Sequence, residues 1–289
     1  MGGIIERLYS RGRQFASGFS KESDSPIRPR LRMLYDVMIY LFGREATVLI
    51  SSISFSFLFS VFPFIVLLLT LANYLQWVEL REAIFESFYH FFPISQEFII
   101  RNLRIYTQRV GQLTLISVVL LAWAGSVFFF ALEAGLDSAY RVPKYRHFVT
   151  SQLIGTIMTV TFGVVAFMAI ELLEIVERLA AGLDFAAAFV DLNILLTLIL
   201  ILLFQVYYFL PNRKQTVAGV LPESLFASVL WMLSNLIFKL LAASWSLQDI
   251  YGPFYISVTL LLWGYISGAI IIGSARLSQD GFFRSKQLT

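Results

Sequence analysis

Residues 194–204 read ILLTLILILLF, a run without a single charged side chain. It lacks the apolar–polar alternation of a membrane β-strand, so it favours a helix. The run belongs to one of six long apolar stretches, at 46–72, 111–135, 150–172, 186–210, 217–243 and 253–275. Each has at least the roughly 20 residues that an α-helix needs to cross about 30 Å of hydrocarbon. The sequence therefore predicts an all-α membrane bundle of six transmembrane helices.

The composition favours the same class of protein. Hydrophobic residues make up 58% of the 289-residue chain and charged residues only 14%, which departs from soluble globular proteins in the direction that lipid demands. The absence of cysteine excludes disulfides, thiolate metal sites and cysteine nucleophiles. A membrane location also explains the net charge of +3, because basic residues attract anionic lipid headgroups. We therefore expect membrane lipids as partners and no nucleic acid.

The distribution of Lys and Arg predicts the orientation. Most of the 22 Lys and Arg residues lie in 1–45, in the connections after the second and fourth apolar stretches, and in the tail. The positive-inside rule then places both termini in the cytoplasm. No cleavable signal peptide is expected, because the first apolar stretch follows a long basic segment.

The pattern predicts three regions. Residues 1–45 form a basic cytoplasmic segment with two interfacial amphipathic helices, residues 46–276 form the six-helix transmembrane domain, and residues 277–289 form a cytoplasmic tail. The long exterior segment 73–110 reads as an amphipathic helical hairpin that lies on the membrane surface or caps the bundle.

Known catalytic patterns are missing. His90 and His147 are isolated and lie on opposite predicted sides of the membrane, as do Asp137 and Asp191. These placements argue against the paired His of zinc proteases and the paired Asp of aspartyl proteases. No Walker motif is present, so ATP hydrolysis is not expected. We therefore expect no enzyme activity, no cofactor and no metal site.

Polar residues within apolar spans are the default functional candidates, because lipid makes them costly. Ser52, Ser56 and Ser60 share one helix face at i, i+4 and i+8, followed by Pro63. This stripe serves either close helix packing or the lining of a cavity, with Pro63 opening the helix. Weaker candidates lie near the exterior ends of the third and fifth spans: Glu171, Glu174 and Lys239.

The end of the second span is the most highly charged place near the membrane. Glu133 and Asp137 lie one helical turn apart, and Arg141 is placed to pair with Asp137 at i+4. The cluster is either a structural clamp at the cytoplasmic boundary, or a gate or headgroup site whose cations are Arg141, Lys144 and Arg146. In the last span, Gly264 and Gly268 have the GxxxG spacing of helix packing.

Several of these stretches resemble one bacterial family. They are SFSFLFSVFP (54–63), WAGS (123–126) with ALEAGLDSAYRV (131–142), LPNRK (210–214) and YGPFYISVTLLLWGYISGAIIIGSA (251–275). Together they resemble the YihY/virulence factor BrkB family of inner-membrane proteins, once misnamed ribonuclease BN. That family usually has Asn at the position of Asp137. The resemblance implies a bacterial inner-membrane protein with six transmembrane helices and both termini inside.

The leading functional prediction is a transporter or flippase-like protein, not driven by ATP, that moves a lipid or other amphiphile in envelope maintenance. The alternative is a non-transporting scaffold that binds an envelope protein through the exterior hairpin 73–110. A homo-oligomer is compatible with both, because small-residue faces such as Gly264 and Gly268 serve packing within or between subunits.

Overall fold

The computed structural model describes residues 27–74, 110–144, 146–180, 184–244 and 250–283. All regular elements within these ranges are helical, which confirms the all-α prediction. They are α2 (Ile27–Leu41), α3 (Arg44–Tyr74), α6 (Val110–Ala139), α7 (Phe148–Ala180), α8 (Asp184–Phe209), α9 (Val217–Ser244), the 3₁₀ turn η1 (Gly252–Phe254) and α11 (Tyr255–Gln279).

Four of the described helices are long and apolar enough to cross a membrane. The qualifying windows lie within α3, α7, α9 and α11, and a shorter apolar segment, Leu195–Phe209, lies within α8. The full count of six spans and the position of the termini stay predictions.

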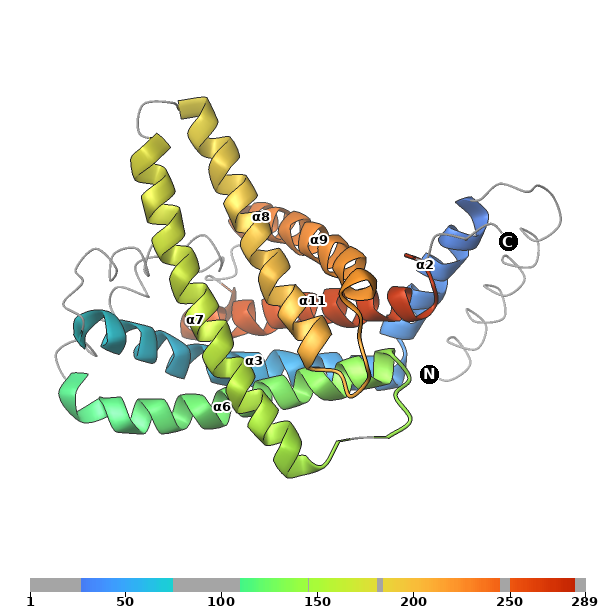
Figure 1. Cartoon of the computed structure of the whole chain (residues 1–289), viewed down its shortest axis with the longest axis horizontal. Helices are drawn as coiled ribbons and strands as arrows, with labels where there is room; N and C mark the ends of the chain where they lie inside the picture. Colours follow the sequence, from blue (N-terminus) through green and yellow to red (C-terminus); the bar gives the residue numbers. More distant parts are fainter. Residues whose placement is uncertain (1–26, 75–109, 145, 181–183, 245–249, 284–289) are drawn as a thin grey trace.

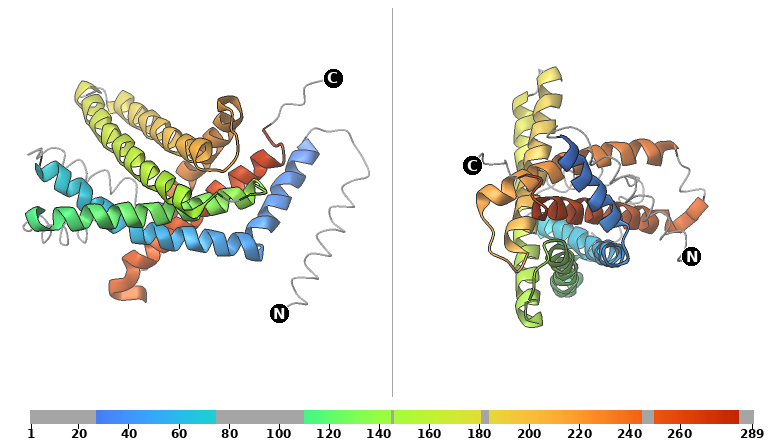
Figure 2. Two further views of the ribbon diagram at one scale, coloured as in Figure 1. Left: turned by 60° about the horizontal axis from the view of Figure 1, so that its bottom comes forward. Right: turned by 90° about the vertical axis from the view of Figure 1, so that its right-hand side faces the viewer.

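Helices that follow one another in the chain pack against one another. Helix α3 packs against α6, α6 against α7, α7 against α8, and α8 against α9. Helix α11 then packs against both α9 and α3 (Figure 1). The connections from α6 to α7, from α7 to α8 and from α8 to α9 are short, as expected for helices that pack as neighbours. In both views of Figure 2, α7 and α8 lean away from α3 and α11, while α7 keeps its contact with α6 and α8 its contact with α9.

The core lies where α3, α6 and α11 meet. Ile53, Leu136 and Ile272 are among its fully buried side chains. A Cβ atom on Gly264 would lie 3.1 Å from the Ser54 Cα atom, and one on Gly268 would lie 3.3 Å from an Ile53 methyl group. The GxxxG pair therefore lets α11 approach α3 closely, as the sequence predicted.

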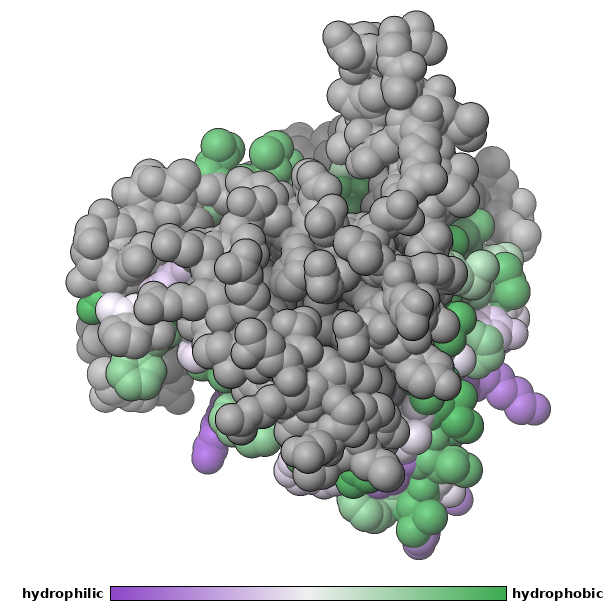
Figure 3. All heavy atoms as spheres, turned by 90° about the vertical axis from the view of Figure 1, so that its left-hand side faces the viewer, coloured by the Kyte–Doolittle hydropathy of each residue, from purple (hydrophilic) through white to green (hydrophobic). Residues whose placement is uncertain are grey.

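The outward surfaces of the long helices are apolar. Exposed side chains on α7 include Leu153, Ile157 and Val164, and apolar side chains predominate among the described atoms visible in Figure 3. On α9, Leu225 and Leu233 are exposed on the same helical face. Surfaces of this kind fit hydrocarbon better than water.

The second predicted interfacial helix is present as α2. It exposes Leu31, Tyr35 and Met38, while Val37 is buried where α2 packs on α11. The first predicted interfacial helix falls within residues 1–26, outside the described residues. So does most of the predicted exterior hairpin 73–110, of which only the flanking ends in α3 and α6 are described.

Candidate functional site

The connection after α6 begins with a left-handed residue. Arg141 has a φ of 56°, its N–H donates to the Ser138 carbonyl, and the Val142 N–H donates to the Asp137 carbonyl. These two hydrogen bonds form the Schellman motif, which satisfies the carbonyl groups at a helix end. The helix therefore stops at Ala139, and the chain turns sharply away from the helix axis just beyond Asp137.

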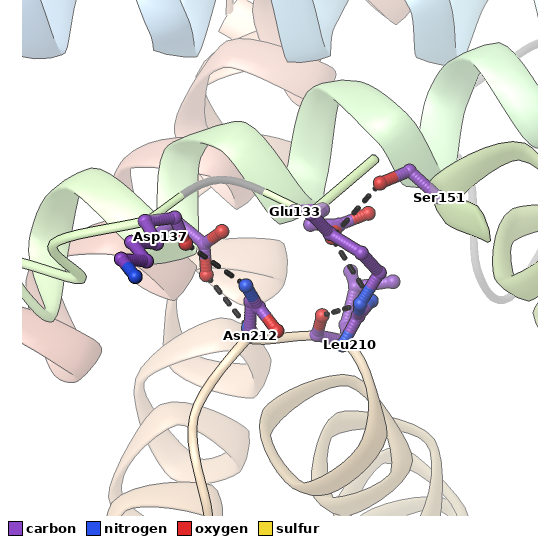
Figure 4. Close-up of polar contacts among 7 residues, drawn as sticks. Glu133, Asp137, Ser151, Leu210 and Asn212 are labelled. Atoms are coloured by element: carbon purple, nitrogen blue, oxygen red, sulfur yellow. Dashed lines mark hydrogen bonds and ion pairs between the residues drawn. The ribbon is translucent and has the colours of Figure 1, made fainter. Parts of the chain in front are cut away.

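Asp137 binds the connection between α8 and α9. Its Oδ1 atom accepts the Asn212 backbone N–H at 2.8 Å, and the Asn212 side-chain amide donates to the Lys144 carbonyl at 2.9 Å. Figure 4 shows Asp137 on α6 pointing toward this connection. Asp137 is buried, so the short carboxylate bond fixes the position of the α8–α9 connection beside α6.

Glu133 holds a second anchor one turn earlier. Its Oε1 atom lies 2.9 Å from Nη1 of Arg146 and 3.2 Å from the Ser151 hydroxyl, which donates to it. The same Arg146 nitrogen donates to the Leu210 carbonyl at 3.3 Å. Glu133 is buried on α6, Ser151 lies on α7 and Leu210 follows α8 (Figure 4). We call Glu133, Asp137, Arg146, Ser151 and Asn212 the anchoring cluster, because it joins α6 to α7 and to the α8–α9 connection.

The predicted pair of Asp137 and Arg141 was wrong. The i+4 rule needs a helix that continues, and the left-handed turn at Arg141 takes its side chain off the helix face. Arg141 instead lies 3.5 Å from Asp280, with 59% of its side chain exposed. Among the described residues, Arg146 is the cation that pairs with a carboxylate of this cluster, and it reaches Glu133 from the α6–α7 connection.

Replacing Arg141 with glycine is expected to raise the free energy of unfolding by about 1 kcal/mol, because glycine adopts the left-handed conformation without steric cost. The exposed pair with Asp280 offsets little of this gain. The measurement is the midpoint of thermal denaturation in detergent, read from the loss of the monodisperse size-exclusion peak. Arg141→Ala, which keeps the strain, should not raise the midpoint; equal midpoints for Gly and Ala would contradict the prediction.

The predicted serine stripe meets different surroundings along α3. Ser52 is exposed, Ser56 is buried and Ser60 is half-buried, with its hydroxyl donating to the Phe57 carbonyl at 2.9 Å. The interhelical bond comes from Ser54, whose hydroxyl donates to the Leu261 carbonyl on α11. Helix α3 continues past Pro63 to Tyr74, so it does not open there.

The stripe and the anchoring cluster are separate. Among the described residues, no hydrogen bond or ion pair joins Ser52, Ser56 or Ser60 to Glu133 or Asp137. Lys144 is exposed beside the cluster. The side chains of the weaker candidates Glu171, Glu174 and Lys239, and that of Pro63, lie outside the described residues.

Glu223 is a further buried carboxyl group that the sequence pattern did not single out. This residue lies on α9 directly after Pro222, within an apolar window, and is fully buried. It accepts a hydrogen bond from the Tyr140 hydroxyl, and the Arg213 guanidinium lies 3.5 Å over the Tyr140 ring. Burial and the neighbouring Glu223 raise the pKa of Tyr140 well above its usual value near 10, so this phenol stays protonated and donates. The sequence did contain a signal for this residue, because a carboxyl group within a predicted transmembrane span is costly and therefore a functional candidate.

Comparisons with known proteins give the family. Residues 42–280 match the family described as Virulence factor BrkB. The chain is 26% identical over 239 residues to YfkH of Bacillus subtilis, which is named as ribonuclease-like; the match covers 77% of this chain and 85% of that protein. It is 22% identical over 237 residues to a UPF0761 membrane protein of Acinetobacter baylyi, covering 78% of this chain and 56% of the longer relative.

No solved structure matches the chain, so the comparisons identify it through sequence. The family match spans every described helix from α3 to α11 and ends at Asp280. It includes all the members of the anchoring cluster. One of the two relatives is named as a membrane protein. The protein therefore belongs to the virulence factor BrkB family.

Proposed function

We propose that this protein is a multi-pass protein of the bacterial inner membrane that moves a lipid or other amphiphile without ATP hydrolysis. We further propose six spans with both termini in the cytoplasm, which puts the anchoring cluster at the cytoplasmic face. The apolar outer faces of α7 and α9 support the membrane part of this proposal.

The observation that carries the transport proposal is buried charge inside an apolar bundle. Glu133, Asp137 and Glu223 are all buried near the end of α6 and the start of α9. Removing a carboxylate from water costs several kcal/mol, even after the surroundings relax. Ionisable groups in membrane spans are rare for this reason, and they commonly mark substrate or ion pathways.

The adjoining surface offers cations to a headgroup. Lys144 is exposed on the α6–α7 connection, and Arg141 is mostly exposed with only a 3.5 Å pair to Asp280. Arg146 is less available, because it is bound to Glu133 and the Leu210 carbonyl. We therefore assign first contact with an anionic headgroup to Lys144 and Arg141.

We propose no catalytic role. The word ribonuclease occurs in the name of a relative and describes that protein. Within the described ranges, no group of three or more His, Cys, Asp or Glu side chains is placed to hold a metal ion.

Asp137→Ala is expected to abolish lipid movement while the protein still inserts, because the α8–α9 connection loses its carboxylate anchor. Ser56→Leu is expected to do the same by filling space around a buried small side chain on α3. The assay uses vesicles of phosphatidylethanolamine and phosphatidylglycerol that contain a fluorescent phospholipid. Dithionite bleaches only the outer leaflet, so a transporter raises the bleached fraction.

Asp36→Ala is the matched control, because Asp36 is an exposed carboxylate on α2 and its removal should leave lipid movement intact. Asp137→Asn is the folding control, because an amide oxygen can accept the same Asn212 N–H. Unchanged bleaching with both Asp137→Ala and Ser56→Leu would remove this site assignment. Bleaching no greater than in empty vesicles for the unmodified protein would remove the transport proposal for these lipids.

A further inference from the structure

Among the described residues, Glu223 is the buried carboxyl group that lies outside the anchoring cluster. It lies in the second turn of α9, and its side chain is 0% exposed. Pro222, the preceding residue, cannot donate the backbone hydrogen bond that position 222 of a helix would give to residue 218. The turn that carries Glu223 is therefore held by fewer backbone bonds than the rest of the helix.

The surroundings of Glu223 contain two hydroxyl groups, those of Tyr140 and Ser278, and no paired cation. Its Oε1 atom accepts from Tyr140, and its Oε2 atom is buried without a hydrogen-bond partner among the described residues. The ion pairs of 4 Å or less within the described ranges involve Glu133 and Asp280, not Glu223.

Each helix packed against this part of α9 contributes to the electrostatics. Tyr140 follows α6, Tyr207 lies on α8, and Arg213 belongs to the α8–α9 connection. On α11, the hydroxyl group of Ser278 faces Glu223. The α11 cation Arg276 is engaged elsewhere, with its guanidinium 3.5 Å from Asp280 and 4.5 Å over the Tyr40 ring.

Arg213 is close enough to Glu223 to act on it electrostatically, and it packs on the ring of Tyr140, whose hydroxyl donates to Glu223. Its guanidinium lies over the Tyr140 ring and donates to Gln279 at 2.7 Å and to Gln215 at 3.1 Å. Its Nε atom is buried without a partner among the described residues. A negative charge on Glu223 attracts this cation, whereas a neutral carboxyl group does not.

These contacts distinguish Glu223 from Glu133. An ionised carboxylate that is fully buried needs a paired cation or several donors to offset its lost hydration. Glu133 has Arg146 and Ser151, whereas Glu223 has the Tyr140 hydroxyl and the Ser278 side chain. A proton on Oε2 removes the charge, forms one O–H bond and needs no other reactant.

We infer that Glu223 is the site at which this protein binds and releases a proton as it moves its substrate. This inference rests on the proposed transport function and deepens it. Proton release leaves a charge that pulls on Arg213, which in turn is bonded to Gln279 at the end of α11. The proton state of Glu223 is thereby linked to the α8–α9 connection that Asp137 anchors.

The first test reads the proton directly. The whole protein is reconstituted in vesicles of phosphatidylethanolamine and phosphatidylglycerol, and infrared difference spectra are recorded while the pH is lowered. The carbonyl stretch of a carboxylic acid in apolar surroundings, which lies at higher frequency than that of the exposed acids, should appear and should be lost in Glu223→Gln. Glu45→Gln, which changes an exposed carboxyl group, should keep the band. Tyr140→Phe should shift the pH at which the band appears, because Glu223 loses its donor.

The second test uses the same vesicles and a fluorescent phospholipid. The rate of lipid movement in the unmodified protein should depend on pH, and Glu223→Gln should lose this dependence. Circular dichroism and size-exclusion profiles establish that Glu223→Gln is folded. If Glu223→Gln is misfolded, Tyr140→Phe still tests the inference, because it keeps the carboxyl group and removes only its donor.

The two tests separate the possible failures. Proton binding at this residue is overturned if the band persists in Glu223→Gln, or if the band changes with the sodium concentration at constant pH. Either result holds whether or not lipid moves. Lipid movement that keeps its pH dependence in Glu223→Gln overturns the coupling. A band lost in Glu223→Gln without lipid movement by the unmodified protein defeats the transport proposal and the coupling with it, and leaves only a titrating carboxyl group.

Discussion

Replacing Arg146 with methionine is expected to lower the free energy of unfolding by about 3 to 5 kcal/mol, because the change strands a buried carboxylate. The side chains of Arg146 and Glu133 are 16% and 5% exposed, and the atoms that pair are 2.9 Å apart. Methionine also lacks the donor that Arg146 gives to the Leu210 carbonyl. The shift is measured as the midpoint of thermal denaturation in detergent.

Arg141→Met is the matched control. Arg141 belongs to the same connection and also has a carboxylate partner, but its pair is exposed and 3.5 Å long. Exposed pairs contribute about 0 to 1 kcal/mol, so its midpoint should stay close to that of the unmodified protein. The double variant Glu133→Gln with Arg146→Met should recover part of the loss, because no buried charge is stranded. Equal effects of the two arginine substitutions would contradict the anchoring role of Glu133.

Gly155→Ala is expected to destabilise the protein by about 2 kcal/mol through overpacking at the contact of α6 and α7. A Cβ atom on Gly155 would lie 2.9 Å from the Ser126 carbonyl oxygen and 3.1 Å from the Ser126 Cα atom. These are backbone atoms of α6, so one helix must move away from the other. This effect outweighs the gain of about 1 kcal/mol that alanine brings to a helix interior.

Gly219→Ala makes the same substitution at an exposed position of α9. Its added Cβ would meet only the Thr216 hydroxyl oxygen, at 3.0 Å, and that side chain can rotate. We expect Gly219→Ala to leave the thermal midpoint unchanged or to raise it. A Gly155→Ala protein as stable as Gly219→Ala would show that α6 and α7 do not approach as closely as the structure places them.

Local rules predicted the helices, because their signals lie within single segments. Apolar runs of sufficient length predicted helices at α3, α6, α7, α8, α9 and α11, and the matching motifs predicted the family. The spacing of Gly264 and Gly268 predicted close packing, although it did not name α3 as the partner. Glu133 and Asp137 were predicted as candidate site residues from the concentration of charge at the end of the second span, which is again a property of one segment.

The partners of these residues could not be predicted in the same way. The pairing of Asp137 with Arg141 assumed a continuing helix, but the left-handed turn ended it, and Asp137 bonds to Asn212 instead. Arg146 reaches Glu133 only because the α6–α7 connection folds back along α6. The environment of Glu223 was the hardest to predict, because its hydrogen-bond donor Tyr140 lies 83 positions away in the chain.

The sequence by itself determined that the chain is a helical membrane protein of the BrkB family, because hydrophobic length and motif order are properties of the chain alone. Only the tertiary structure decided which buried charges are paired. An ion pair or hydrogen bond requires atoms within a few ångströms, and the packing of distant helices sets those distances. Packing thus leaves Glu133 neutralised by Arg146 and Glu223 with a tyrosine donor and no paired cation.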